Sequence, residues 1–369
     1  MLLFLDEHFV AEVLNNNASA ISAINLVSLG RKHGKHMLLS NRESMKQIRD
    51  CDYVNSDTKR VFTYLFENYP TFAYIKDKLS FYVKVVTGVK HMSLNQSDNA
   101  NIFELSYDYL QEINIITETI VIGENQTEIN FYNYLSKYYK SKNNLGSMHT
   151  CFSPRMGGGS TTHTVYSSIQ ASEQNFCLCF VDSDKKHPTA SLGDTLKAVQ
   201  RIDNPAKLLS HVHALNSREI ENLIPLSILE KICKEDVNHN NGYESLKRIV
   251  ETENYKDILY LDFKNGLSIK NYRKIKDVNL KTFLDNLLIN SSLFNREVLD
   301  EIYNHENEDE LEIEVLIQGL GSNVLDRTIR YLNDNGLAEP ELDFQEQIDE
   351  WNTLGEKFTN WTCSGTKII

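Results

Sequence analysis

Four short apolar runs alternate with stretches of helical periodicity between residues 117 and 215, and this alternation constrains the fold most strongly. The runs cover residues 117–122, 148–152, 176–181 and 211–215. Apolar residues recur at helical spacing in 128–139 and again in 162–170. Strands that alternate with helices form right-handed crossover units, which build a mostly parallel sheet. We therefore predict an α/β domain here, with its functional edge at the carboxyl ends of the strands.

The chain of 369 residues is long enough for more than one structural unit. Residues 1–113 show an α/β pattern of their own, with apolar runs at 2–5 and 37–39, helical spacing over 9–29 and a polar surface loop expected at 93–101. We assign 1–113 to a partner-binding or regulatory module and 114–226 to the catalytic α/β domain. Residues 227–369 should be mainly helical, with a β-turn element at 258–268 that contains Asn265-Gly266.

Charge and composition exclude several classes of protein. The formal net charge of -13 argues against a protein that coats nucleic acid by bulk electrostatics. No apolar run approaches the roughly 20 residues of a membrane span, so we expect neither a transmembrane helix nor a signal peptide. The 6 cysteines show no disulfide or zinc spacing, which favours a reducing cytoplasm.

Acidic residues follow the expected strands where the chain leaves the sheet. Glu124 comes after the first run, Asp182 and Asp184 after the third, and Glu221 after the fourth. Each acid alone could cap a helix or fill a turn. Together they should converge at one sheet edge, where crowded carboxylates require a cation, and oxygen ligands favour Mg²⁺ or Mn²⁺.

Four segments resemble the Toprim domain shared by topoisomerases, bacterial primases and overcoming-lysogenization-defect nucleases. Segment 121–132 (VIGENQTEINFY) is similar to the family's strand and glutamate turn, and 180–184 (FVDSD) to its Asp-x-Asp motif. Segments 217–223 (SREIENL) and 262–266 (DFKNG) resemble motifs of Toprim-like effectors in PARIS-type phage-defence loci. The resemblance covers about residues 115–266 and implies a Rossmann-like, mostly parallel sheet with flanking helices.

The resemblance also implies an activity and a set of site residues. It implies a Mg²⁺- or Mn²⁺-dependent nuclease whose metal ligands are Glu124, Asp182, Asp184 and Glu221. Glu124, Asp182, Asp184 and Lys264 would then carry catalysis, with Lys264 as a phosphate contact. The chain departs from the family at Asn125, where glycine is usual, and at Glu128, which replaces an aspartate.

Other residues are candidates for contact with nucleic acid. Arg155, Lys185, Lys264 and Arg273 are the basic side chains we assign to this role. The glycines 157–159 either offer N–H groups to a phosphate or form a tight turn that needs positive φ. We expect His211 and His213 to be packed rather than zinc-bound, and Cys177 and Cys179 to be small core residues.

From these expectations we predict a toxic nuclease effector of bacterial anti-phage defence. It would act on DNA or RNA in the cytoplasm and would not bind a membrane. Such an effector needs restraint, so we expect a partner such as an ATPase sensor, and homo-oligomers are possible. An alternative is an inactive Toprim-fold scaffold subunit, which the departure at Asn125 favours. Phosphate transfer to a nucleotide is a third possibility.

Overall fold

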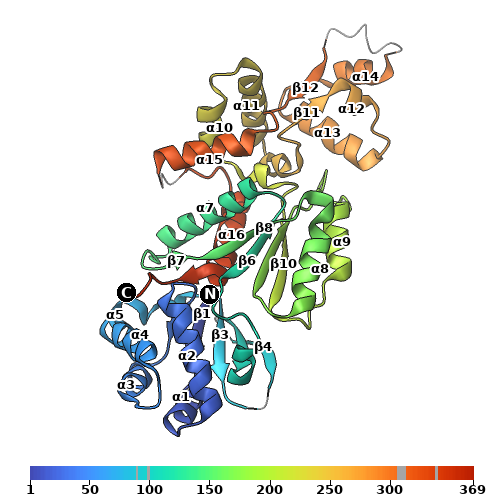
Figure 1. Cartoon of the computed structure of the whole chain (residues 1–369). Coiled ribbons are helices and arrows are strands. Elements are labelled where there is room, and N and C mark those ends of the chain that lie inside the picture. Colours follow the sequence, from blue (N-terminus) through green and yellow to red (C-terminus); the bar gives the residue numbers. More distant parts are fainter. Residues whose placement is uncertain (89, 98–99, 306–312, 337–339) are drawn as a thin grey trace. The chain divides into compact units, whose positions relative to one another are not determined.

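A computed structural model of the chain describes residues 1–369 except 89, 98–99, 306–312 and 337–339 (Figure 1). The chain has an α/β fold and forms two compact units. The first comprises Met1–Phe180, Val199–His213 and Asn352–Ile369, and the second Val181–Ala198 and Ala214–Trp351. Residues 1–113 and most of the expected 114–226 sheet therefore belong to the same unit.

The first unit begins with a five-stranded sheet of strand order β2-β1-β3-β5-β4. Its strands are β1 (Leu2–Leu5), β2 (Met37–Leu39), β3 (Phe81–Val86), β4 (Met92–Gln96) and β5 (Asn101–Ser106). All neighbouring pairs are parallel except β4 and β5, which are antiparallel. The surface loop predicted over 93–101 is therefore wrong in its first part. Strand β4 is a polar edge strand, and such a strand lacks the apolar pattern of a buried one.

Short helices accompany this sheet. They are α1 (Glu7–Leu14), α2 (Ala18–Lys32), α3 (Arg42–Asp50), α4 (Ser56–Glu67), α5 (Tyr69–Phe72), α6 (Ile75–Lys78) and the 3₁₀ turn η1 (Tyr107–Gln111). The helical spacing over 9–29 belongs to two helices, because Asn16 has a φ of 63° and breaks the chain direction. Asn17 then caps α2, since its side-chain oxygen accepts the N–H groups of Ser19 and Ala20.

A four-stranded sheet of order β10-β9-β6-β8 follows in the same unit. Its strands are β6 (Thr119–Gly123), β8 (Phe152–Met156), β9 (Cys177–Val181) and β10 (Ser210–Ala214). Strand β6 is parallel to both β8 and β9, as the alternation predicted. The run 148–152 is divided between β8 and the short β7 (His149–Thr150), which pairs with β13 (Cys363–Ser364).

Helices cover both faces of this second sheet. Helix α7 (Gln126–Lys142) and the C-terminal part of α16 (Gln345–Thr362) lie on one face, where Tyr132 stacks on Phe180 at 4.1 Å and Phe358 stacks on Phe180 at 6.3 Å. Helix α8 (Thr162–Ser172), preceded by η2 (Gly159–Thr161), lies against β6. Helices α7 and α16 approach closely at Gly355, where a Cβ would lie 2.5 Å from the carbonyl oxygen of Leu135.

The second unit is mainly helical. Its elements are part of α9 (Asp194–Ile202), η3 (Ile220–Leu223), α10 (Leu226–Cys233), α11 (Val237–Val250), η4 (Tyr255–Tyr260), β11 (Gly266–Ser268), α12 (Ile269–Arg273), α13 (Val278–Asn290), α14 (Arg296–Asn304), β12 (Val315–Gln318), α15 (Val324–Asn335) and the first part of α16. The apolar run at 258–263 begins within a 3₁₀ turn. The Asn-Gly signal marks a tight turn, in which Gly266 has a φ of 68° and β11 then pairs with the distant β12.

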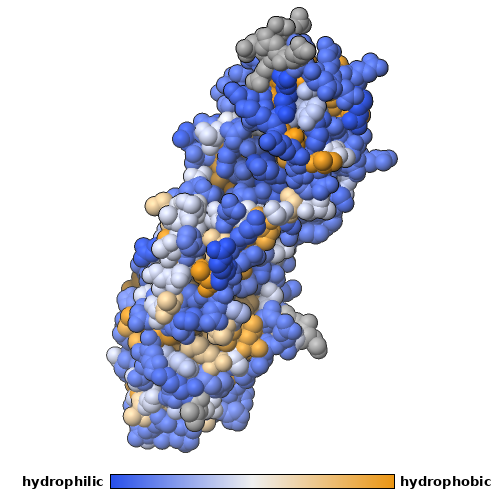
Figure 2. Space-filling view, turned by 90° about the vertical axis from the view of Figure 1, so that its right-hand side faces the viewer, coloured by the Kyte–Doolittle hydropathy of each residue, from blue (hydrophilic) through white to orange (hydrophobic). Residues whose placement is uncertain are grey.

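No helix in the described part of the chain is long and apolar enough to cross a membrane. Polar residues dominate the face of the molecule shown in Figure 2. Large exposed apolar side chains are scattered over separate elements, such as Met156 in β8 and Val237 in α11.

Candidate functional site

The carboxyl end of the parallel sheet carries a compact group of acidic side chains. Ile122 of β6 is paired with Cys179 of β9, so the two strands end at nearly the same level. Glu124 directly follows β6, and Asp182 directly follows β9. Glu124, Glu128 and Asp182 each offer a carboxylate oxygen, and these oxygens lie within 4.8 Å of one another. Such an oxygen cluster is suited to a hard divalent cation.

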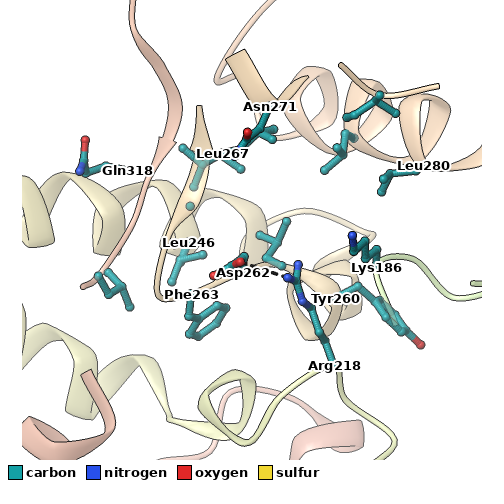
Figure 3. A pocket seen from close by; sticks show the side chains of 16 residues that line it. Lys186, Arg218, Leu246, Tyr260, Asp262, Phe263, Leu267, Asn271, Leu280 and Gln318 are labelled. Atoms are coloured by element: carbon teal, nitrogen blue, oxygen red, sulfur yellow. Dashed lines mark hydrogen bonds and ion pairs between the residues drawn. The ribbon is translucent and has the colours of Figure 1, made fainter. Parts of the chain in front are cut away.

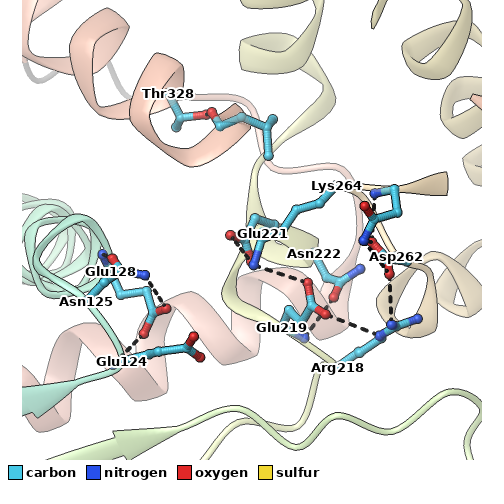
Figure 4. A network of polar contacts seen from close by, with 12 residues as sticks. Glu124, Asn125, Glu128, Arg218, Glu219, Glu221, Asn222, Asp262, Lys264 and Thr328 are labelled. Atoms are coloured by element: carbon cyan, nitrogen blue, oxygen red, sulfur yellow. Dashed lines mark hydrogen bonds and ion pairs between the residues drawn. The ribbon is translucent and has the colours of Figure 1, made fainter. Parts of the chain in front are cut away.

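The turn that presents Glu124 is built as a reciprocal helix cap (left side of Figure 4). The Asn125 side chain accepts the N–H of Glu128 at 3.0 Å and donates to a Glu128 oxygen at 2.9 Å. The other Glu128 oxygen accepts the N–H of Glu124 at 2.9 Å. Asn125 has an extended φ of -141°, which any residue adopts, so its side chain supplies the cap and glycine is not required.

Glu128 is the member of this group that we did not predict as a ligand. It is 3% exposed, whereas Glu124 is exposed and Asp182 is half-buried. The signal was present in the sequence, since Glu128 stands three residues after Asn125 at the spacing of a capping box. That spacing explains its structural role but does not by itself place it beside Asp182.

The three glycines after β8 pack against the same turn. The N–H of Gly157 donates to Gly123 at 2.8 Å, and the N–H of Gly158 donates to the Glu124 carbonyl at 2.9 Å. Gly158 and Gly159 have φ values of 69° and 61°, so the tight-turn interpretation of this segment is the one the backbone satisfies. A Cβ on Gly159 would lie 3.4 Å from a Glu124 carboxylate oxygen. The glycines therefore leave room for the Glu124 carboxylate.

Asp184 lies in the loop after β9, where hydrogen bonds within the second unit fix its backbone. The Ser183 hydroxyl donates to the Ser217 carbonyl at 2.6 Å, and the Asp184 N–H donates to the Arg218 carbonyl at 2.9 Å. Asp184 has a φ of 53°, and Gly193 leaves space for its side chain. Burial raises the pKa of Asp184, and the nearby cation of Arg218 opposes that rise.

Lys264 is at the centre of a network of charges in the second unit (right side of Figure 4). Its ammonium lies 3.0 Å from Glu221 and 3.5 Å from Glu219. Arg218 pairs with Asp262 at 3.0 Å and with Glu219 at 3.4 Å. The network thus joins two cations to three carboxylates within the Arg-Glu-Ile-Glu and Asp-x-Lys segments.

The electrostatics of this network follow from its burial. Burial alone would lower the pKa of Lys264, but the carboxylates of Glu221, Glu219 and Asp182 raise it by more, so the ammonium is held charged. Burial raises the pKa of Glu219, against the opposing effect of Lys264. Lys264 therefore acts as the counter-charge of these acids.

The predicted metal ligands thus have different surroundings. Glu124 and Asp182 share the acidic group, whereas Asp184 and Glu221 are not among its members in the described residues. Glu221 is 3% exposed and pairs with Lys264, a contact that its place after a strand did not predict.

The predicted nucleic-acid contacts are also dispersed along the chain. Arg155 is exposed on β8 and Lys185 is half-buried after β9. The Arg273 guanidinium donates to the His305 carbonyl. Residues at the end of α12 and the start of α13 line a pocket of about 840 Å³. Its basic lining residues are Arg273, Lys274, Lys276 and Lys281.

The remaining candidates are two half-buried histidines and two fully buried cysteines. Burial lowers the pKa of His211 to about 4 and that of His213 to about 3, so both rings are neutral at pH 7. Cys177 and Cys179 are fully buried in β9, as expected for core residues. Comparison of the chain with protein-family models, curated proteins and solved structures finds no match. Function must therefore be inferred from the geometry of these residues.

Proposed function

We propose that the chain is a metal-dependent nuclease of the Toprim type that hydrolyses phosphodiester bonds in DNA or RNA. The proposal is carried by the group formed by Glu124, Glu128 and Asp182 at the carboxyl end of a parallel sheet, with oxygens within 4.8 Å of one another. Three carboxylate oxygens at this spacing fit Mg²⁺ or Mn²⁺, which prefer oxygen ligands. The order of the acids along the chain and the four motif-like segments also support it.

The acidic residues of the group and Lys264 would have different roles in the reaction. Glu128 is fixed by two hydrogen bonds and would act as a rigid ligand, together with Asp182. Glu124 is exposed, so its carboxylate can reach solvent and accept a proton from an attacking water. A bound divalent ion would supply charge stabilisation for the phosphoryl oxygens. Lys264 would balance the charge of Asp182 and of the neighbouring glutamates.

The direct test is cleavage of single-stranded and double-stranded DNA and RNA in Mg²⁺. We expect Glu124→Gln and Asp182→Asn each to lower the rate by at least about a hundredfold, since each removes a charge from the site. Glu173→Gln is the matched control. Glu173 is an exposed glutamate at the end of α8, where it pairs with Lys207. Undiminished activity in both site variants would refute the assignment.

A catalytically inactive scaffold is the second candidate. Glu128 already accepts two hydrogen bonds, and Lys264 already balances Glu221 and Glu219, so much of this charge is compensated by the protein itself. Calorimetric titration with Mn²⁺ separates the two candidates. A nuclease should take up Mn²⁺ in the wild type and lose that uptake in Asp182→Asn, whereas a scaffold should take up none.

We further propose that the chain is a cytoplasmic defence effector restrained by a partner such as an ATPase sensor. This rests on the resemblance of its motifs to those of phage-defence nucleases. Co-expression with the products of neighbouring genes, followed by size-exclusion chromatography, tests it. A chain that elutes alone in every combination would count against the partner.

A further inference from the structure

The second unit contains a cavity of about 390 Å³ that is separate from the acidic group (Figure 3). Leucine, isoleucine and phenylalanine side chains from α11, β11, α13 and β12 and from the segment after η4 form the apolar part of its wall, and polar side chains line the remainder. The volume lies within the range of small-molecule pockets, which are mostly apolar with a few well-placed polar groups. The cavity therefore has the size and the walls of a ligand site.

The polar groups of this cavity are unusual for an acidic chain. Lys186 and Arg218 reach it together with a single acid, Asp262, which gives a net positive lining in a chain of net charge -13. Figure 3 shows both cationic side chains on one side of the cavity. Lys186 is exposed and Arg218 is half-buried, so an anion can approach them from solvent.

Two carboxamides lie across the cavity from these cations, on Asn271 of α12 and Gln318 of β12 (Figure 3). A carboxamide offers a donor and an acceptor side by side, and this pair is complementary to the N6 and N7 edge of adenine. The apolar wall suits the face of a base, the carboxamides suit its polar edge, and the cations suit a phosphate.

We propose that this cavity binds one mononucleotide unit, with its base against the apolar wall and its phosphate at Lys186 and Arg218. The phosphate would share Arg218 with Asp262 and Glu219, to which the guanidinium is paired at 3.0 Å and 3.4 Å. The Arg218 carbonyl also accepts the Asp184 N–H at 2.9 Å, so an occupied cavity borders the loop that carries Asp184. The proposal goes beyond the nuclease function, because nucleotide binding here requires neither a metal nor cleavage.

Calorimetric titration of the full chain with adenosine 5′-monophosphate, in EDTA, tests the site. We expect saturable binding with one nucleotide per chain, and binding of ribose 5-phosphate at least about tenfold weaker because it has no base. Lys186→Gln should weaken nucleotide binding by about tenfold, since it removes a charged phosphate contact. Leu267→Trp should block the cavity without altering a charge.

Lys247→Gln is the matched control, because Lys247 is an exposed lysine next to the cavity residue Leu246 and does not line the cavity. It should bind as the wild type does, and thermal unfolding should show that all variants are folded. No uptake by the wild type, equal uptake of ribose 5-phosphate, or unchanged affinity in both folded cavity variants would overturn the proposal. Because EDTA removes metals, failure here is distinguishable from failure of the nuclease assignment.

The nucleotide can come from two sources, either free in solution or as part of a single strand. Competition with a five-residue deoxyadenylate strand distinguishes them once nucleotide binding has been measured. Displacement of the mononucleotide by the strand would identify a subsite for nucleic acid. Binding of the mononucleotide without displacement would identify a free nucleotide as the ligand.

Discussion

Replacing Lys264 with methionine removes the central cation of the charge network while keeping a side chain of similar length. The ammonium lies 3.0 Å from Glu221 and 3.5 Å from Glu219. The Glu221 and Glu219 side chains are 4% and 14% exposed, so Lys264→Met would leave charges where water can solvate them little.

The expected loss of stability follows from that burial. Breaking a fully buried ion pair costs roughly 3–5 kcal/mol. The Lys264 side chain is 31% exposed, so solvent already screens part of the attraction. We therefore expect Lys264→Met to lower the free energy of unfolding by about 2–3 kcal/mol at pH 7.

The loss should depend on pH. Burial already raises the pKa of Glu219, and removal of Lys264 takes away a group that opposes this rise. A carboxyl group with a raised pKa in the folded state binds protons more readily there than in the unfolded state. Acidification therefore favours the folded variant relative to the wild type, and the difference between them should shrink as the pH falls from 7 toward 5.

Urea unfolding in EDTA at pH 7 and pH 5 measures both effects. The double variant Lys264→Met/Glu221→Gln should recover much of the lost stability, because it also removes the buried carboxylate charge that Lys264 balanced. Lys270→Met, an exposed lysine of α12, is the control and should change stability by less than about 0.5 kcal/mol. A loss below about 0.5 kcal/mol in Lys264→Met, or a loss that does not shrink at pH 5, would refute the reasoning.

Changes at three further positions probe the acidic turn and His213. Glu128→Ala should destabilise the protein by about 1 kcal/mol, because it removes the two hydrogen bonds that the Glu128 carboxylate accepts at the start of α7. Glu128→Gln should keep an acceptor and weaken only Mn²⁺ uptake. Thermal unfolding and calorimetry together check this. Gly159→Ala should cost about 1–2 kcal/mol because of its positive φ. It should also lower cleavage, because its Cβ would lie beside the Glu124 carboxylate; unchanged rates would contradict that contact. Burial lowers the pKa of His213 to about 3 in the folded protein. Between about pH 6.5 and pH 3 the His213 ring is therefore protonated in the unfolded chain but not in the folded one, so the stability should fall as the pH drops through this range. His213→Gln should flatten this dependence in unfolding measured between pH 4 and 7, and an unaltered slope would show that another group causes it.

The two central strands of the second sheet, β6 and β9, were predictable because strands buried on both faces are continuous apolar runs, whereas β8 is largely exposed and begins only at the last residue of the predicted run 148–152. Strand β9 lies within the predicted segment 176–181, and β6 overlaps the predicted segment 117–122 and ends one residue beyond it. Polar strands and short turns were not predictable in this way. Strand β4 is polar because it is an edge strand, and residues 255–260 form a 3₁₀ turn, since a short apolar run fits a buried turn as well as a strand.

Linear order was enough to put Glu124 and Asp182 at one end of a parallel sheet, because chain direction and strand length determine where each strand ends. It was not enough to choose their companions. Glu128 joins them through a helix cap, whereas Glu221 pairs with Lys264, which is 43 residues further along the chain. These contacts depend on how the loops fold and on which buried charges pair with one another. Such interactions join residues far apart in the chain, so the local spacing of residues does not predict them.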